Sequence, residues 1–152
     1  MQARMKNPAV SVPGSMQAIQ TLIGAIQKSG AAPAAVELAH LRASQINGCS
    51  ACIDFGVKQA RKEGTVSDDK LFAVSAWREA PYFSDQERAA LALAEAMTRL
   101  SDREDAVPDE IWAEARRHFE EPALAGLVLS IAMTNFFNRV NVTTRQAPGA
   151  AW

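Results

Sequence analysis

From Glu37 to Gly64 the chain reads ELAHLRASQINGCSACIDFGVKQARKEG. Its apolar residues recur at intervals of three and four, which is the period of a helix rather than of a strand. Asn47-Gly48 is a turn signal that stops the first helix, and a cysteine follows it at once. Gly64 is placed to end the second helix. The stretch therefore predicts two consecutive helices, with the motif Cys49-Ser50-Ala51-Cys52 at the start of the second.

The helical period continues along the rest of the chain, and strict alternation of apolar and polar residues is absent. We expect an all-α, single-domain fold of about six to eight helices, at 15–28, 33–46, 49–64, 67–77, from a capping box at 84–87, from 108–110, and at 122–142. The last of these is apolar nearly all round, so it is expected in the core or between subunits. The first is expected to bury an apolar stripe: Met16, Ile19, Leu22, Ile23 and Ile26. Residues 14–143 would form the domain, with 1–13 and 144–152 as loose tails.

Length and composition limit the classes of function. A chain of 152 residues, 48% hydrophobic and 22% charged, fits one globular domain. Its net charge of −1 gives no electrostatic reason to expect nucleic acid or an anionic membrane as a partner. Residues 1–16 make a poor secretory signal, and the apolar run 122–137 falls short of the ~20 residues of a spanning helix. We therefore predict a cytoplasmic location, where thiols are mostly kept reduced.

The two cysteines are the residues most suited to chemistry. At positions i and i+3 of a helical turn, the sulfurs of Cys49 and Cys52 can meet with little backbone movement. The free N–H groups of that turn favour a thiolate, which can attack a peroxide or a disulfide. Two alternatives stay open: small apolar residues packed in a core, or a zinc site, although His40 and His118 are the only histidines and a structural site needs four ligands. No phosphate loop or dinucleotide fingerprint is present, so we expect no cofactor and no metal.

The residues around the motif add a second argument. The stretch Glu37–Gly64, and within it Leu41–Cys49 (LRASQINGC), strongly resembles the alkylhydroperoxidase D-like (AhpD-like) proteins of the carboxymuconolactone decarboxylase superfamily. The resemblance spans roughly residues 15–146 and continues through three further segments: 76–79 (AWRE), 83–91 (FSDQERAAL) and 135–139 (NFFNR).

The resemblance implies an all-helical fold assembled as trimers or hexamers, and a thiol-dependent peroxidase or disulfide oxidoreductase activity. In the best-known members the second cysteine of the motif is the reactive thiol, which would be Cys52. The first cysteine, here Cys49, closes the disulfide. A glutamate twelve positions before the first cysteine belongs to the proton relay of the family, and Glu37 occupies that place.

The sequence departs from the family at the relay histidine. The usual histidine lies four residues after the second cysteine, where this chain has Gly56, and a histidine that some members carry inside the motif is here Ala51. General-base assistance is typically worth about 10²–10⁴-fold in rate, so we expect disulfide chemistry with low peroxidase turnover. His40 shares a helix face with Glu37, and we hypothesise that it supplies the missing imidazole if that face meets the cysteine helix.

Three functions are compatible with these residues. The first is an enzyme that cycles Cys49 and Cys52 between dithiol and disulfide while it reduces a hydroperoxide or another disulfide, with electrons from an unidentified thiol donor. The second is a redox sensor or helical assembly protein whose dithiol controls oligomerisation without turnover. The third is a lyase of the carboxymuconolactone decarboxylase type, which the retained cysteine pair disfavours.

Overall fold

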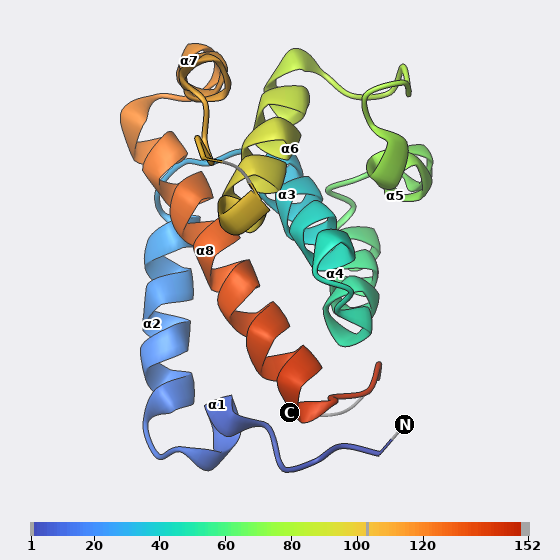
Figure 1. The fold of residues 1–152 in the computed structure, drawn as a ribbon, viewed down its shortest axis with the longest axis vertical. Coiled ribbons are helices and arrows are strands. Elements are labelled where there is room, and N and C mark those ends of the chain that lie inside the picture. Colours follow the sequence, from blue (N-terminus) through green and yellow to red (C-terminus); the bar gives the residue numbers. More distant parts are fainter. Residues whose placement is uncertain (1, 103, 150–152) are drawn as a thin grey trace.

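The computed structural model describes residues 2–102 and 104–149, and within them it is entirely helical, with eight α-helices, two short 3-10 helices and no strand. This confirms the all-α prediction (Figure 1). The elements in chain order are α1 (Pro8–Ser11), α2 (Ser15–Gln27), α3 (Pro33–Ile46), α4 (Ser50–Glu63), α5 (Asp68–Ala73), η1 (Val74–Ala76), α6 (Asp85–Thr98), η2 (Leu100–Asp102), α7 (Asp109–His118) and α8 (Glu121–Thr144).

Local chemistry sets most of the helix boundaries. Pro33 is the first residue of α3, where its missing N–H costs nothing. The expected capping box opens α6: the Glu87 N–H donates to Ser84 Oγ at 3.2 Å, and the Ser84 N–H donates to the Glu87 carboxylate at 2.8 Å. The helix expected over 67–77 is shorter, because the α-helix ends at Ala73 and continues as the 3-10 turn η1.

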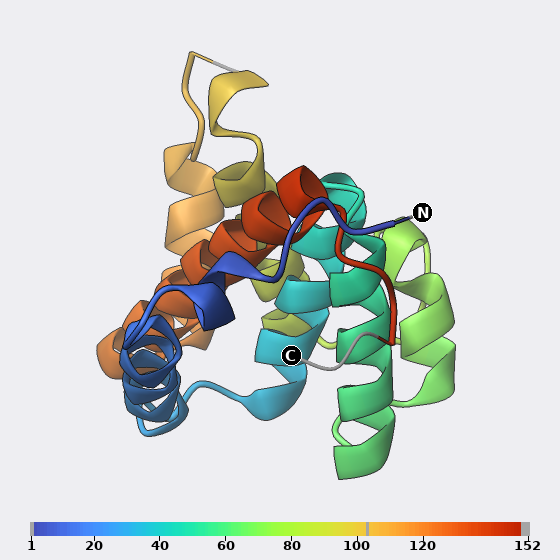
Figure 2. The same ribbon diagram turned by 90° about the horizontal axis from the view of Figure 1, so that it is seen from below.

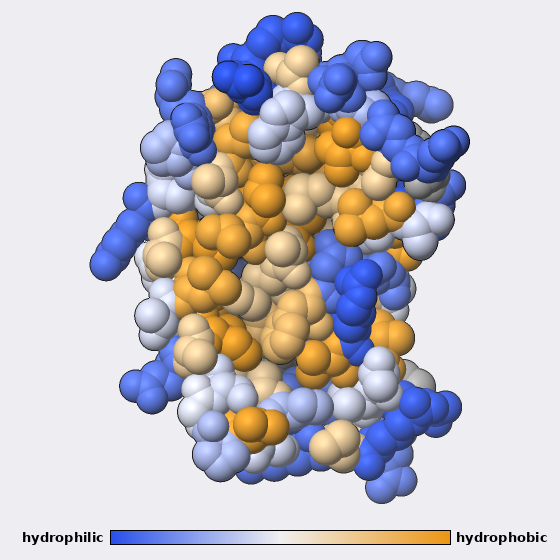
Figure 3. All heavy atoms as spheres, turned by 60° about the vertical axis from the view of Figure 1, so that its left-hand side comes forward, coloured by the Kyte–Doolittle hydropathy of each residue, from blue (hydrophilic) through white to orange (hydrophobic). Residues whose placement is uncertain are grey.

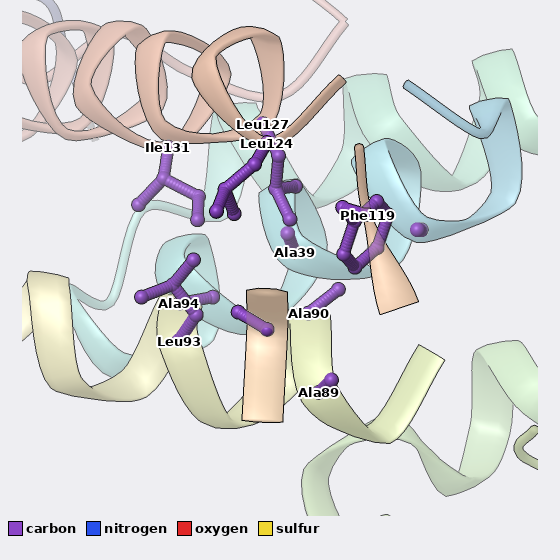
Figure 4. Close-up of a cluster of buried hydrophobic side chains, with 11 residues drawn as sticks. Ala39, Ala89, Ala90, Leu93, Ala94, Phe119, Leu124, Leu127 and Ile131 are labelled. Carbon is purple, nitrogen blue, oxygen red and sulfur yellow. The ribbon is translucent and has the colours of Figure 1, made fainter. Parts of the chain in front are cut away.

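Helix α3 lies at the centre of the fold and packs against α4, α6 and α8 (Figure 1). One of its faces joins a cluster of buried apolar side chains with α6, α7 and α8 (Figure 4); the members are Ala35, Ala39, Ala89, Ala90, Leu93, Ala94, Ala115, Phe119, Leu124, Leu127 and Ile131. A second face joins a cluster on the α5 side; its members are Leu38, Leu41, Ala60, Val66, Leu71, Val74, Trp77, Phe83 and Leu91. Alanine is frequent in the first cluster, so helix backbones can approach closely there.

Helix α8 is the other central element. By length and composition it is the one helix in the described part of the chain that could cross a membrane. However, its buried Asn135, Asn138 and Asn141 are hydrogen-bonded inside the domain, and α8 contacts α2, α3, α4, α6 and α7. We conclude that α8 is a core helix of a folded domain.

The apolar stripe of α2 is only partly buried, which differs from the prediction. Of its five residues only Ile26 is buried, and Leu22 is 37% exposed. The reason is that α2 packs mainly on α8 and α1, so no helix covers its outer side. Figure 3 shows an extensive apolar surface on this side of the molecule. The exposed large apolar residues of α2 and α8 are Leu22, Leu129, Phe136 and Val142.

Parts of both segments expected as loose tails are bonded to the domain within the described residues. Residues 2–12, which we call the N-terminal strap, contain α1 and run beside the C-terminal end of α8 (Figure 2). The Arg4 N–H donates to the Thr144 carbonyl at 2.9 Å, and Gln146 Nε2 donates to the Met5 carbonyl at 3.0 Å. These long-range bonds fix both end segments to the domain. The parts of the expected tails at residues 1 and 150–152 lie outside the described residues.

Candidate active site

The two cysteines lie at the start of α4, as predicted, and are joined in a disulfide. Cys49 is the N-cap of the helix, and its Sγ accepts a hydrogen bond from the Cys52 N–H at 3.3 Å. The Cα atoms of the pair are 5.3 Å apart. The side chains are buried, with 2% of Cys49 and 3% of Cys52 exposed. The free N–H groups of this first turn are suited to stabilising a thiolate once the pair is reduced.

Amide side chains from α8 hold the turn that carries the cysteines. Asn47, the C-cap of α3, donates from Nδ2 to Asn135 Oδ1 at 2.9 Å and to Asn138 Oδ1 at 2.8 Å. Asn138 Nδ2 in turn donates to Ser44 Oγ at 3.1 Å. A third amide, Asn141, donates from Nδ2 to Cys52 Sγ at 3.4 Å. This network therefore connects the middle and the end of α8 to the redox motif.

His40 lies against the cysteine helix, so the geometric condition of the hypothesis is met. Its Nε2 is 3.1 Å from the Cys52 carbonyl oxygen, and its Nδ1 is 3.2 Å from Thr134 Oγ1 of α8. A Cβ atom added to Gly56 would lie 2.7 Å from His40 Cδ2 and 2.9 Å from Nε2. The imidazole of His40 therefore occupies the space in which a side chain at position 56 would begin.

The contacts of His40 suit both protonation states. A carbonyl can only accept, so Nε2 carries a proton in its contact with Cys52. In the neutral ring Nδ1 accepts from the Thr134 hydroxyl. In the charged ring Nδ1 donates to that oxygen, and the hydroxyl turns to the Ser130 carbonyl, 2.9 Å away. Burial lowers the pKa of His40 below 6.5, against the opposing effect of the Cys52 carbonyl.

Glu37 lies one turn before His40 on α3, and both line a cavity of about 390 Å³ between α2, α3, α4 and α8. Burial, with a smaller contribution from the charge of Glu63, raises the pKa of Glu37 from 4.5 to about 7. Apolar side chains form much of the wall, among them Ile23, Phe55 and Met133. A carboxyl group with this pKa can both accept and release a proton near neutral pH.

All four residues singled out in the sequence thus come from the α3–α4 pair. Glu37 and His40 share the cavity, while the disulfide lies in the buried turn beside it, and the two groups meet where His40 contacts the Cys52 carbonyl. In the described part of the chain, no group of three or more Cys, His, Asp or Glu side chains is placed to hold a metal ion.

Sequence reasoning missed Asn141, which contacts the sulfur of Cys52. The signal is nevertheless in the sequence. Asn135, Asn138 and Asn141 recur every three residues along a helix that is otherwise apolar, so they share one face. Buried amides on an apolar helix need hydrogen-bond partners, and here those partners include the turn that carries the cysteines.

Comparison with known proteins defines the family. The sequence pattern of the carboxymuconolactone decarboxylase family matches residues 13–96, more than half of the chain. The chain belongs to the carboxymuconolactone decarboxylase family. Within this family it is an AhpD-like protein by its resemblance to ATU0492 of Agrobacterium tumefaciens, a protein of unknown function described as a candidate antioxidant defence protein AhpD. The sequence of ATU0492 is 33% identical to this chain, and its crystal structure matches with a TM-score of 0.87. The match covers 99% of this chain and 100% of ATU0492.

Two curated relatives of this chain are uncharacterised proteins. The uncharacterised protein YdfG of Bacillus subtilis is 38% identical over 106 residues, which is 70% of each chain. The uncharacterised protein YnjA of Escherichia coli is 37% identical over 110 residues, covering 72% of this chain and 58% of YnjA. The debrominase Bmp8 has the same fold, with a TM-score of 0.76 and 24% identity over 91% of this chain and 73% of Bmp8.

Proposed function

We propose that this protein is a thiol-dependent oxidoreductase that cycles Cys49 and Cys52 between dithiol and disulfide while it reduces a hydroperoxide or another disulfide. The observation that carries the proposal is the bonded cysteine pair at the N-terminus of α4, in a chain of the AhpD-like type. The adjoining cavity supports it, because a titratable carboxyl group and an imidazole lie there beside the cysteine helix.

The peroxide cycle balances as follows. The Cys52 thiolate attacks the terminal peroxide oxygen; an S–O bond forms, the O–O bond breaks, and the alkoxide leaves as an alcohol after taking a proton. The Cys49 thiol then attacks the sulfenic acid of Cys52, so that a disulfide forms and water leaves. A small or protein thiol donor returns two electrons and two protons by thiol–disulfide exchange.

We assign the proton transfers of this cycle to Glu37 and His40. His40 can gain or lose a proton at Nδ1 with no more than a rotation of the Thr134 hydroxyl. Its ring fills the space next to Gly56, which is consistent with a relocated imidazole. The contact of His40 with Cys52 is to the backbone carbonyl, so a proton would pass to the sulfur through a bound water or the substrate.

The test is peroxide consumption by the full chain with dithiothreitol as donor. We expect slow but measurable turnover that is lost in Cys52→Ser. Cys49→Ser should accumulate a Cys52 sulfenic acid that a dimedone probe traps. Ser50→Ala, an exposed position between the cysteines, is the matched control and should behave as the wild type. Equal rates in all four proteins would refute the proposal.

Two further measurements, oligomer size on oxidation and activity on a lactone acid, separate the alternatives. A redox sensor would change its oligomer size on oxidation without consuming peroxide above the background rate. A lyase of the decarboxylase type would keep its activity on a lactone acid when either cysteine is replaced.

We also propose that the protein works as a homo-oligomer, a trimer or a hexamer, in the cytoplasm, without nucleic acid or membrane partners. The support for self-association is the exposed apolar surface of α2 and α8 (Figure 3). Large exposed apolar patches on soluble domains commonly mark protein interfaces.

A further inference from the structure

The hydrogen bond from Asn141 to Cys52 Sγ is one end of a chain of contacts that begins in the N-terminal strap. Asn141 is 1% exposed and Asn7 is 4% exposed, so both amides are shielded from water. Asn7 Nδ2 lies 3.0 Å from Asn141 Oδ1, and Asn141 Nδ2 lies 3.4 Å from Cys52 Sγ. Residue 7 is thereby connected to the sulfur of the redox motif.

The direction of each hydrogen bond in this series is fixed by the donor at its start, the backbone N–H of Ala9. The backbone N–H of Ala9 can only donate, and it donates to Asn7 Oδ1 at 3.0 Å as the cap of α1. Asn7 therefore turns its NH₂ group, which also only donates, towards Asn141. Asn141 must accept with Oδ1, so its own NH₂ group faces Cys52. An amide can otherwise present either end to a neighbour, so this order decides whether the sulfur meets a donor or an acceptor.

We propose that Asn7, through Asn141, holds a hydrogen-bond donor against the Cys52 sulfur and thereby stabilises the Cys52 thiolate when the disulfide is reduced. Asn141 contacts the reacting atom and is a catalytic residue in this scheme, whereas Asn7 is a positioning residue. The inference rests on the proposed function, because thiolate stabilisation matters only for a working thiol. It extends that function to a segment at the other end of the chain.

The strap is anchored well enough for this role. The Arg4 N–H is bonded to Thr144 at the end of α8, and the Met5 carbonyl is bonded to Gln146 just after it. In addition, Arg4 Nη1 donates to the Thr143 carbonyl at 2.9 Å. Figure 2 shows the strap beside this end of α8. Asn7 is therefore held from both sides, by these bonds before it and by the first turn of α1 after it.

The test is the thiol pKa of Cys52, measured in the full chain from thiolate absorbance and from the pH dependence of iodoacetamide alkylation, in a Cys49→Ser background. Asn7→Asp keeps an oxygen to cap α1 but offers Asn141 an acceptor, so the Asn141 amide should rotate and turn its oxygen to the sulfur. We expect the pKa to rise by about one unit, which lowers the ratio of thiolate to thiol tenfold at any given pH. Lys6→Gln makes the same change in net charge at an exposed neighbouring position and should leave the pKa unchanged.

A second variant keeps the inference testable if Asn7→Asp does not fold. Asn141→Leu removes the donor without adding charge and should raise the pKa in the same direction. Wild-type pKa values in either variant, when folded, would overturn the inference. These outcomes are distinct from a failure of the proposed function, because absent peroxide turnover in the wild-type protein leaves the thiol pKa measurable.

Discussion

At the scale of single residues, the fold changes the protonation of two neighbouring groups in opposite ways. Burial raises the pKa of Glu37 to about 7 and lowers the pKa of His40, so it favours the uncharged form of both groups. In both cases the cause is the same, since removal from water disfavours the charged form of either group. A neutral carboxyl and a neutral imidazole in one cavity can exchange protons with a substrate without a large change in local charge.

The pKa of Glu37 predicts how the stability of the protein varies with pH. Because the folded pKa lies above the unfolded value, the folded state binds more protons between pH 4.5 and about 7, and stability falls as pH rises through this window. Glu37→Gln removes this pH-dependent contribution to the free energy of unfolding. We expect the variant to gain stability relative to the wild type as pH rises, on the order of 1 kcal/mol by pH 8, since partial exposure screens the effect.

Urea unfolding at pH 5 and pH 8 measures this difference. The control is Glu79→Gln, an exposed glutamate whose replacement should give the same small change at both pH values. A Glu37→Gln effect that does not depend on pH would contradict the raised pKa.

At the scale of secondary-structure elements, helix boundaries were predictable because their causes are local. Pro33 and the capping box of α6 act within one turn, and they mark the same helix starts in the sequence and in the structure. The sequence singled out Cys49 and Cys52 by their motif and Glu37 by the family resemblance. His40 followed from its position on the same helix face as Glu37.

The strap and the role of Asn141 could not be predicted in this way. The bond from Asn7 to Asn141 joins residues 134 positions apart, and no local pattern records such a pairing. The incomplete burial of α2 has a similar cause. An apolar stripe shows that a face avoids water, but it does not show whether the same chain or another one covers it.

The packing of α3 on α4 gives a prediction at this scale. Gly56→Ala places a Cβ atom 2.7 Å from the ring of His40, so it should destabilise the protein by about 1–3 kcal/mol through overpacking. In a His40→Ala background the ring is absent, so the same substitution should cost less; the contact of the new Cβ with Leu41 Cδ2 at 2.9 Å remains in both backgrounds. A double-mutant cycle from urea unfolding measures this coupling, which we expect to exceed about 1 kcal/mol. An additive result would show that the ring does not limit the space beside Gly56.

At the scale of the whole molecule, each of two sides carries an exposed phenylalanine: the side formed by α2 and α8, and the side formed by α5. Phe136 of α8 is 45% exposed. Phe72 of α5 is 75% exposed but lies across the molecule from α2 (Figure 1). If another copy of the chain covers the first surface, a charge introduced there must be buried without a partner, which disfavours assembly.

We therefore expect Phe136→Glu to dissociate the oligomer, whereas Phe72→Glu, which introduces the same charge at another exposed phenylalanine, should leave it intact. Size-exclusion chromatography with light scattering gives the mass of each protein. Far-UV circular dichroism verifies that both variants are folded. A wild-type protein that is monomeric at micromolar concentration would refute the proposed assembly, and dissociation by Phe72→Glu alone would place the interface elsewhere.

The burial of the disulfide bears on the pace of the catalytic cycle. With 2% of Cys49 and 3% of Cys52 exposed, an incoming thiol cannot line up with the S–S bond until the first turn of α4 opens. At high donor concentration, the rate at which the disulfide is reduced should therefore reach a plateau set by the rate of this opening. The plateau should not depend on the reduction potential of the donor. Compact donors would then outpace bulky ones of equal potential. A slow turnover rate in peroxide assays would in that case report how often the first turn of α4 opens, rather than how reactive the thiolate is.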